Sequence, residues 1–176
     1  MIEYKVLNKE EISKVKEIDR SDVAPGIYKV LDGNLIIENN QFIHPGFNEE
    51  NFERVVRELT TDVEMGGVFI GAFSKDRLVG ISGFQSELIG NEKNMLNFGP
   101  LWIDKYHRRM GIAKKLVNLS IEKAKDFGVN KFYISATPSS NTISFYLSQG
   151  CRLIETPDER LFKKEPDDIH LELVFK

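Results

Sequence analysis

Residues 97–128 read NFGPLWIDKYHRRMGIAKKLVNLSIEKAKDFG, and this stretch decides the fold. The apolar run Leu96–Ile103 predicts a strand, and Gly99-Pro100 inside it predicts a bulge rather than a regular ladder. Apolar residues then recur at helical spacing over Ile112–Ala124, and Gly128 provides a stop just past the last turn. The stretch therefore predicts a strand, a basic turn and an amphipathic helix in succession.

The turn between strand and helix, His107–Lys115, has the chemistry of an anion site. The first turn of a helix has backbone N–H groups without intrahelical partners and carries the positive end of the helix dipole. Gly111 has no Cβ and Ala113 has only a methyl group, so an anion can approach the backbone closely. The turn predicts a pyrophosphate site, although an ordinary solvated basic turn would carry the same residues.

The composition fits a single domain over residues 1–176. The formal net charge of -3 argues against general binding to nucleic acid or to a membrane surface. The single cysteine, Cys151, excludes an intrachain disulfide and favours a reducing compartment. No apolar run approaches the ~20 residues that span a bilayer, and the N-terminal stretch lacks the apolar core of a signal peptide. We therefore expect a cytoplasmic protein, and nothing in the sequence points to a metal site.

The other elements follow from hydrophobic periodicity. We expect strands at Ile2–Leu7, Gly67–Ser74, Leu78–Leu88, Lys131–Ala136, Cys151–Ile154 and Ile169–Phe175, and helices capped by Asn8, over Asn48–Thr61 and over Thr142–Gln149. Asp32-Gly33 between apolar runs predicts a hairpin at residues 28–38, either purely structural or forming a wall beside a substrate. Residues 156–168 are expected to be a charged connection.

Two motifs resemble one known family. The spacing Arg108-x-x-Gly111-x-Ala113 resembles the Gln/Arg-x-x-Gly-x-Gly/Ala motif of the GCN5-related N-acetyltransferases (GNAT family), which cradles the pyrophosphate of acetyl-CoA. The segment Asn141–Tyr146, followed by Gly150-Cys151, resembles the second signature of that family, with Cys151 in place of the usual aromatic residue. The order of elements also matches, closely over residues 67–175 and loosely over residues 1–66.

The resemblance implies an α/β fold in which a twisted mixed sheet of about seven strands has helices on both faces. The hairpin at 28–38 would be an N-terminal insertion. It also implies an enzyme that uses acetyl-CoA, without a metal, to acetylate an amine of a small molecule or peptide, as a monomer or homodimer. The implied cofactor-binding residues are Leu101, Trp102, Ile103, Arg108, Arg109, Met110, Gly111, Ile112, Ala113, Lys114, Asn141 and Tyr146.

The resemblance assigns catalysis to few side chains. Tyr146 would protonate the departing CoA thiolate, because a tyrosine keeps its proton at neutral pH. A backbone N–H near Leu101 would bind the oxyanion. The central strand offers Asn97, which cannot act as a base, so Glu87 on the preceding strand is the nearest candidate.

Other interpretations stay open at this point. Tyr146 could instead be a core residue, and Glu87 an exposed charge at a strand end. The whole domain could be a non-catalytic acyl-CoA sensor or another phosphate-binding α/β protein.

Overall fold

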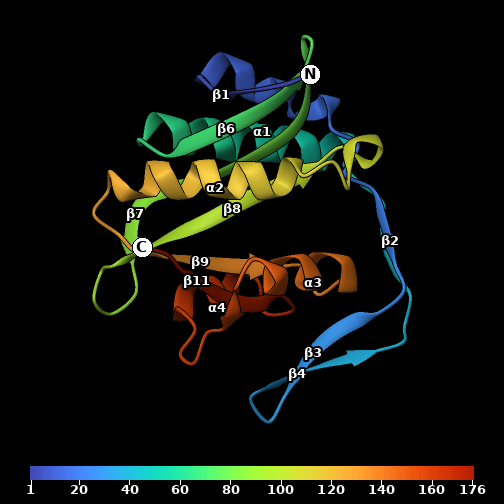
Figure 1. Cartoon of the computed structure of the whole chain (residues 1–176), viewed down its shortest axis with the longest axis vertical. Helices are drawn as coiled ribbons and strands as arrows, with labels where there is room; N and C mark the ends of the chain where they lie inside the picture. Colours follow the sequence, from blue (N-terminus) through green and yellow to red (C-terminus); the bar gives the residue numbers. More distant parts are fainter.

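Seven strands form one sheet in the order β1-β6-β7-β8-β9-β11-β10, in a computed structural model that describes residues 1–176 (Figure 1). The strands of this sheet are β1 (Ile2–Val6), β6 (Val68–Ser74), β7 (Arg77–Ile89), β8 (Met95–Ile103), β9 (Lys131–Ala136), β10 (Arg152–Leu153) and β11 (Ile169–Val174). The helices are η1 (Lys9–Glu17), α1 (Glu49–Glu64), η2 (Lys105–His107), α2 (Ile112–Lys125), α3 (Ser140–Ser148) and α4 (Glu159–Lys164). None of them has the length and apolar character needed to cross a bilayer.

The central strands β8 and β9 run parallel and pair over only a short length. Pairing begins at Met95 with Lys131 and ends at Asn97 with Tyr133. Beyond this point β8 continues to Ile103 without a partner on that side, and Figure 1 shows the two strands diverging. The backbone edge of β8 that faces β9 is therefore unpaired over the rest of the strand.

The predicted bulge lies in β8. Phe84 of β7 pairs with Phe98, whereas Ser82 pairs with Leu101, so the register shifts across Gly99-Pro100. An extra residue on one strand bends it and increases its local twist. The bulge thus redirects β8 just after it leaves β9.

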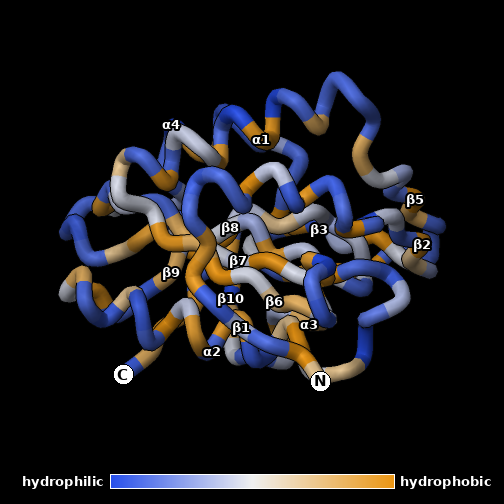
Figure 2. Tube along the Cα trace, turned by 90° about the horizontal axis from the view of Figure 1, so that it is seen from above, coloured by the Kyte–Doolittle hydropathy of each residue, from blue (hydrophilic) through white to orange (hydrophobic).

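Helices cover both faces of the sheet (Figure 2). On one face, α2 and α3 cover the largest apolar cluster, which includes Phe84, Phe98 and Phe132. On the other face, η1 and α1 cover a second cluster around Phe69, and α4 covers a third, smaller one. We refer to these as the α2/α3 face and the α1/α4 face.

The chain between η1 and α1 adds two small antiparallel pairs. They are β2 (Asp22–Ala24) with β5 (Phe42–His44), and the hairpin β3 (Ile27–Leu31) with β4 (Asn34–Glu38). The hairpin extends away from the main sheet in Figure 1. Its base is fixed to the start of α3, where Tyr28 N donates to Pro138 O at 2.8 Å and Ser140 N donates to Gly26 O at 2.9 Å.

The predicted fold class is confirmed, including the seven strands and the N-terminal hairpin. Asn8 and Glu11 form the expected capping box. The structure corrects two details. The first helix is a 3₁₀ helix that ends at Glu17 instead of near Arg20, and the connection 156–168 contains α4. Six residues are too few to show a helical period, so α4 could not be predicted from its pattern.

Candidate active site

The turn that precedes α2 presents free backbone N–H groups. Arg109 and Gly111 have φ values of 61° and 78°, and Gly111 is the N-cap without any side-chain cap. The first N–H to find an acceptor is that of Lys115, which donates to Gly111 O at 3.1 Å, whereas those of residues 111–114 find none in the chain. Successive N–H groups in such a turn form a concave anion receptor.

Three cations around this turn are in no ion pair: Arg109, Lys114 and Lys115. The side chain of Arg108 is already bound, because its Nη1 lies 2.7 Å from a carboxylate oxygen of Asp22 and its Nη2 donates to Ser21 O at 2.9 Å. The turn therefore combines free N–H groups with positive charge that is not neutralised by the protein.

The side chains of the predicted β8 contacts point to opposite faces. Leu101 and Ile103 pack with α2, whereas the ring of Trp102 lies 5.1 Å from that of Phe47 on the α1/α4 face. All three side chains are therefore engaged within the protein. What this part of β8 leaves available to a ligand is its unpaired backbone edge.

Asn141 lies in the first turn of α3, but Ser139 rather than Asn141 caps the helix. The Nδ2 of Asn141 donates to the carboxylate of Asp22, at 3.1 and 3.3 Å, and to Val23 O at 3.3 Å. Because Asp22 also holds Arg108, strand β2 connects the two motifs that the sequence indicated separately. No sequence pattern singled out Asp22, which lies in a stretch where no element was expected.

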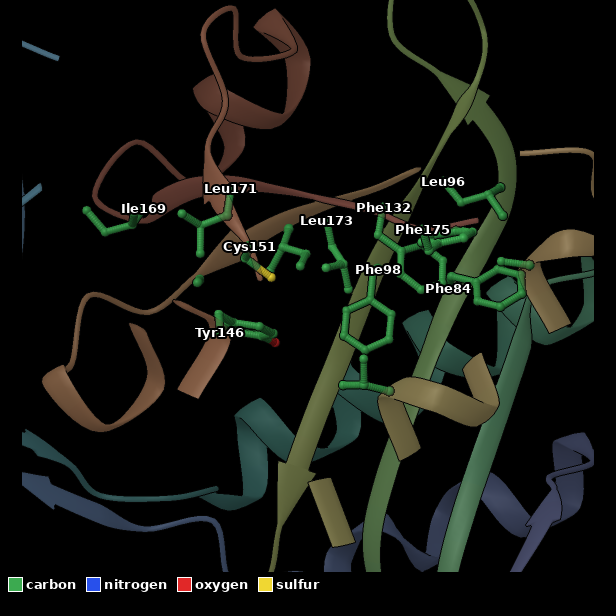
Figure 3. Close-up of a cluster of buried hydrophobic side chains, with 14 of the residues drawn as sticks. Phe84, Leu96, Phe98, Phe132, Tyr146, Cys151, Ile169, Leu171, Leu173 and Phe175 are labelled. Carbon is green, nitrogen blue, oxygen red and sulfur yellow. The ribbon is translucent and has the colours of Figure 1, made fainter. Parts of the chain in front are cut away.

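Tyr146 lies on α3 in the cluster beneath that helix, and it is 7% exposed. Figure 3 shows its hydroxyl directed toward Phe98 of β8, across the separation of β8 and β9. The hydroxyl makes no hydrogen bond within the protein. Burial raises the pKa of Tyr146 above its usual value. The phenol therefore keeps its proton at neutral pH and has no partner inside the chain.

The carboxylate of Glu87 is already engaged in an ion pair. It pairs with Arg160 of α4 at 2.9 Å, and the side chain of Glu87 is 56% exposed. A different carboxylate is connected to the end of the β8–β9 pairing. Asn97 Nδ2 donates to Gln85 Oε1 at 3.1 Å, and Gln85 Nε2 donates to both carboxylate oxygens of Asp62 on α1 at 3.1 Å.

Burial raises the pKa of Asp62, which favours a carboxyl group that can exchange a proton nearer to neutral pH. Asp62 lies just beyond the helix expected over Asn48–Thr61, in the last part of α1. No sequence pattern indicated this role, because only the fold brings α1 over β8.

Comparisons with known proteins agree with this architecture. The model of the acetyltransferase (GNAT) family matches residues 35–151. A comparison with curated proteins returned no match.

Three crystal structures share the fold over almost the whole chain. Nourseothricin acetyltransferase has 15% identity over 99% of both chains, with a TM-score of 0.73. A Bacillus anthracis protein, described as a streptothricin acetyltransferase and bound to acetyl coenzyme A, has 17% identity over 100% of this chain and 99% of its own, with a TM-score of 0.73. PaiA N-acetyltransferase from Thermoplasma acidophilum, bound to coenzyme A, has 17% identity over 99% of both chains, with a TM-score of 0.65. The family match covers more than half of the chain, which therefore belongs to the GNAT acetyltransferase family.

Proposed function

We propose that this protein is an N-acetyltransferase that passes the acetyl group of acetyl-CoA directly to an amine. The observation that carries the proposal is the run of free N–H groups at the start of α2, next to the separation of β8 and β9. A pyrophosphate fits such a receptor. The unpaired edge of β8 offers backbone groups to the amides of the pantetheine arm.

Within the proposed cofactor site, the backbone of residues 109–114 and the side chains of Arg109 and Lys114 bind the phosphates. Arg108 acts indirectly, because it holds Asp22, which in turn holds Asn141. The side-chain oxygen of Asn141, Oδ1, accepts no hydrogen bond within the protein and is available to a pantetheine amide.

Acetyl-CoA supplies a thioester carbonyl that an amine can attack, and CoA leaves as its thiolate. The protein then contributes mainly positioning and charge stabilisation. We assign the oxyanion to a backbone N–H near Leu101, where the bulge redirects β8. Tyr146 donates its proton to the thiolate.

Cys151 does not form a covalent acetyl intermediate in this proposal. The residue is buried, and burial raises the pKa of its thiol to about 12. A thiol with that pKa is almost fully protonated at neutral pH, whereas the thiolate is the nucleophile. Direct transfer to the amine is therefore favoured over a two-step route.

The proton of the acceptor amine goes to a carboxylate on the α1/α4 face. Glu87 is one candidate, and Asp62 is the other, because it alone is connected by hydrogen bonds to Asn97 at the end of the β8–β9 pairing. The acceptor is an amine of a small molecule or peptide. A cytoplasmic location and a monomeric or dimeric state stay predictions.

A panel of amines incubated with acetyl-CoA, with release of free thiol as the readout, tests the proposed reaction. Amine-dependent thiol release supports the enzyme. Binding of acetyl-CoA by calorimetry without release for any amine would favour a non-catalytic sensor. Absence of binding would exclude both functions.

A further inference from the structure

Arg20, in the loop after η1, is a cation without an acidic partner. Its Nη2 contacts His44 Nε2 at 2.8 Å, and it takes part in no ion pair. Its Nε is the one fully buried side-chain nitrogen or oxygen atom in the chain that has no hydrogen-bond partner. Nη1 also makes no hydrogen bond but is not fully buried.

Two aromatic rings hold this guanidinium in place. Its central carbon lies 4.4 Å from the centre of the Phe47 ring and 4.7 Å from the centre of the Trp102 ring. Contact with both rings restricts the position of the guanidinium, because the aromatic faces attract the cation. The side chain is thus pre-organised, while two of its three nitrogens lack acceptors.

The neighbouring cations are neutralised, and Arg20 is not. Lys105 pairs with Asp19 and Arg108 with Asp22, both at 2.7 Å. Burial lowers the pKa of Arg20 to about 10, so it remains charged at neutral pH. Burial and the charge of Arg20 both lower the pKa of His44, so the histidine stays neutral and supplies no negative charge. A partly buried cation without an anion costs stability, which calls for a reason.

The position of Arg20 supplies that reason. Trp102 belongs to β8, and its ring lies on the α1/α4 face together with Phe47. The proposed phosphate turn and Tyr146 belong to helices on the opposite face. An acceptor must therefore reach the separation of β8 and β9 from the α1/α4 face, where Asn97 and Asp62 are also found.

We propose that Arg20 binds a carboxylate carried by the acceptor, so that the substrate class is an amine that also bears a carboxylate, such as an amino acid or a peptide. This inference rests on the proposed acetyl transfer. The carboxylate accepts hydrogen bonds from the free guanidinium nitrogens while the amine of the same molecule points toward the thioester. Hydrogen bonds between two charged groups are stronger than neutral ones.

Matched acceptor pairs test the proposal: an amino acid and its C-terminal amide, with kcat/KM measured for each. We expect the wild-type protein to favour the free carboxylate roughly ten- to hundredfold, as one charge-assisted contact predicts. Arg20→Gln should bring the ratio close to one, Arg20→Lys should retain part of it, and KM for acetyl-CoA should stay unchanged. Arg54→Gln is the control, because it removes an exposed positive charge on α1.

Three results would overturn the proposal. The wild-type protein could show no preference for the carboxylate. Arg20→Gln could lower the activities with the amino acid and with its amide equally, together with the melting temperature, which would show that Arg20 has only a structural role. It could also raise KM for acetyl-CoA, which would assign Arg20 to a cofactor phosphate.

A second arm does not depend on turnover. In the presence of CoA, an N-acetylated amino acid should raise the melting temperature of the wild-type protein more than its amide does, and this difference should vanish in Arg20→Gln. If it does so while no amine releases thiol, the carboxylate site stands and the proposed reaction fails. Thiol release without any carboxylate preference would support the reaction and exclude the carboxylate site.

Discussion

Gly111 meets two separate requirements at one position. Its φ of 78° is unfavourable for any residue with a Cβ, and nothing lies within 4 Å of where that Cβ would be. The open space is the place proposed for the pyrophosphate. Gly128, at the other end of α2, has a φ of 72° and equally open space, but no proposed ligand. A comparison of the same substitution at the two glycines therefore distinguishes an effect of backbone strain from an effect on ligand binding.

Gly111→Val should weaken acetyl-CoA binding about tenfold or more, because its side chain occupies the phosphate position. Gly111→Val and Gly128→Val should lose similar stability, roughly 1–2 kcal/mol from the left-handed backbone. Calorimetry with acetyl-CoA and thermal melts measure the two effects. Equal affinity in Gly111→Val and Gly128→Val would exclude the turn as the cofactor site.

Tyr146→Phe should reduce kcat by at least about a hundredfold, because it removes the proton for the thiolate while it keeps the ring. The melting temperature should hold, since the hydroxyl has no hydrogen bond to lose. KM for acetyl-CoA should change little, because the lost contact belongs mainly to the transition state. Tyr4→Phe is the control, because Tyr4 lies on β1, the edge strand at the end of the sheet opposite β10. A normal kcat under conditions where chemistry limits the rate would indicate that water, and not Tyr146, protonates the thiolate.

The base is decided by comparing Asp62→Asn with Glu87→Gln. Burial raises the pKa of Asp62, so a base at this position must lose its proton before it acts. The rate should then rise with pH through that pKa in the wild-type protein, and Asp62→Asn should lose the acidic limb of the profile. Glu87→Gln should keep the limb, because that carboxylate is exposed and paired with Arg160. The reverse pattern would restore Glu87 as the base.

At the scale of elements, the hairpin β3–β4 forms one wall of a cavity. The cavity has a volume of about 820 Å³ and lies between the hairpin and the segment from β10 to β11, with Tyr28, Val30 and Phe162 among its lining residues. This volume is in the range that holds a small molecule. The hairpin base is fixed to α3 by backbone hydrogen bonds, so the base and the tip have different roles.

Removal of the tip, residues 30–35, should raise the acceptor KM and leave KM for acetyl-CoA nearly unchanged. The physical reason is that the tip contributes to the cavity wall and not to the attachment at Pro138. Steady-state kinetics with each substrate varied in turn measure both constants. A large drop in melting temperature with equal effects on both constants would show that the hairpin is structural.

For the whole molecule, Asp168 makes stability depend on pH. Burial, and then Glu165 and Asp167, raise the pKa of Asp168 from 3.8 to about 6. Between these values the folded protein binds more protons than the unfolded chain, so its free energy of unfolding falls as pH rises. Once the pH is well above 6, Asp168 is ionised in both states, and the decrease in the free energy of unfolding is complete.

Asp168→Asn should therefore be more stable than the wild-type protein at pH 7.5, on the order of 1–3 kcal/mol. Below about pH 4 the two proteins should be similar, because the aspartic acid is then neutral in both states. Melting curves over this pH range measure the difference. A constant offset between the two proteins at every pH would assign the effect to packing.

Sequence alone determined the features that depend on neighbouring residues. The strand with its bulge, the glycine turn, the amphipathic helix after it, the capping box at Asn8 and the Asp32-Gly33 hairpin are local, because a few adjacent residues set the backbone conformation and the periodicity. The family resemblance rested on two such local patterns, the glycine turn and the segment Asn141–Tyr146, together with the order of the elements.

Tertiary structure alone decided which distant residues meet. Asp22 contacts Arg108, 86 positions away, and Asn141, 119 positions away, and no local pattern marks it. The same holds for Arg20 between Phe47 and Trp102, and for Asp62 near Asn97. Such contacts arise only when packing of the apolar faces closes the long loops between these residues, so their free energy belongs to the whole fold and to no single segment.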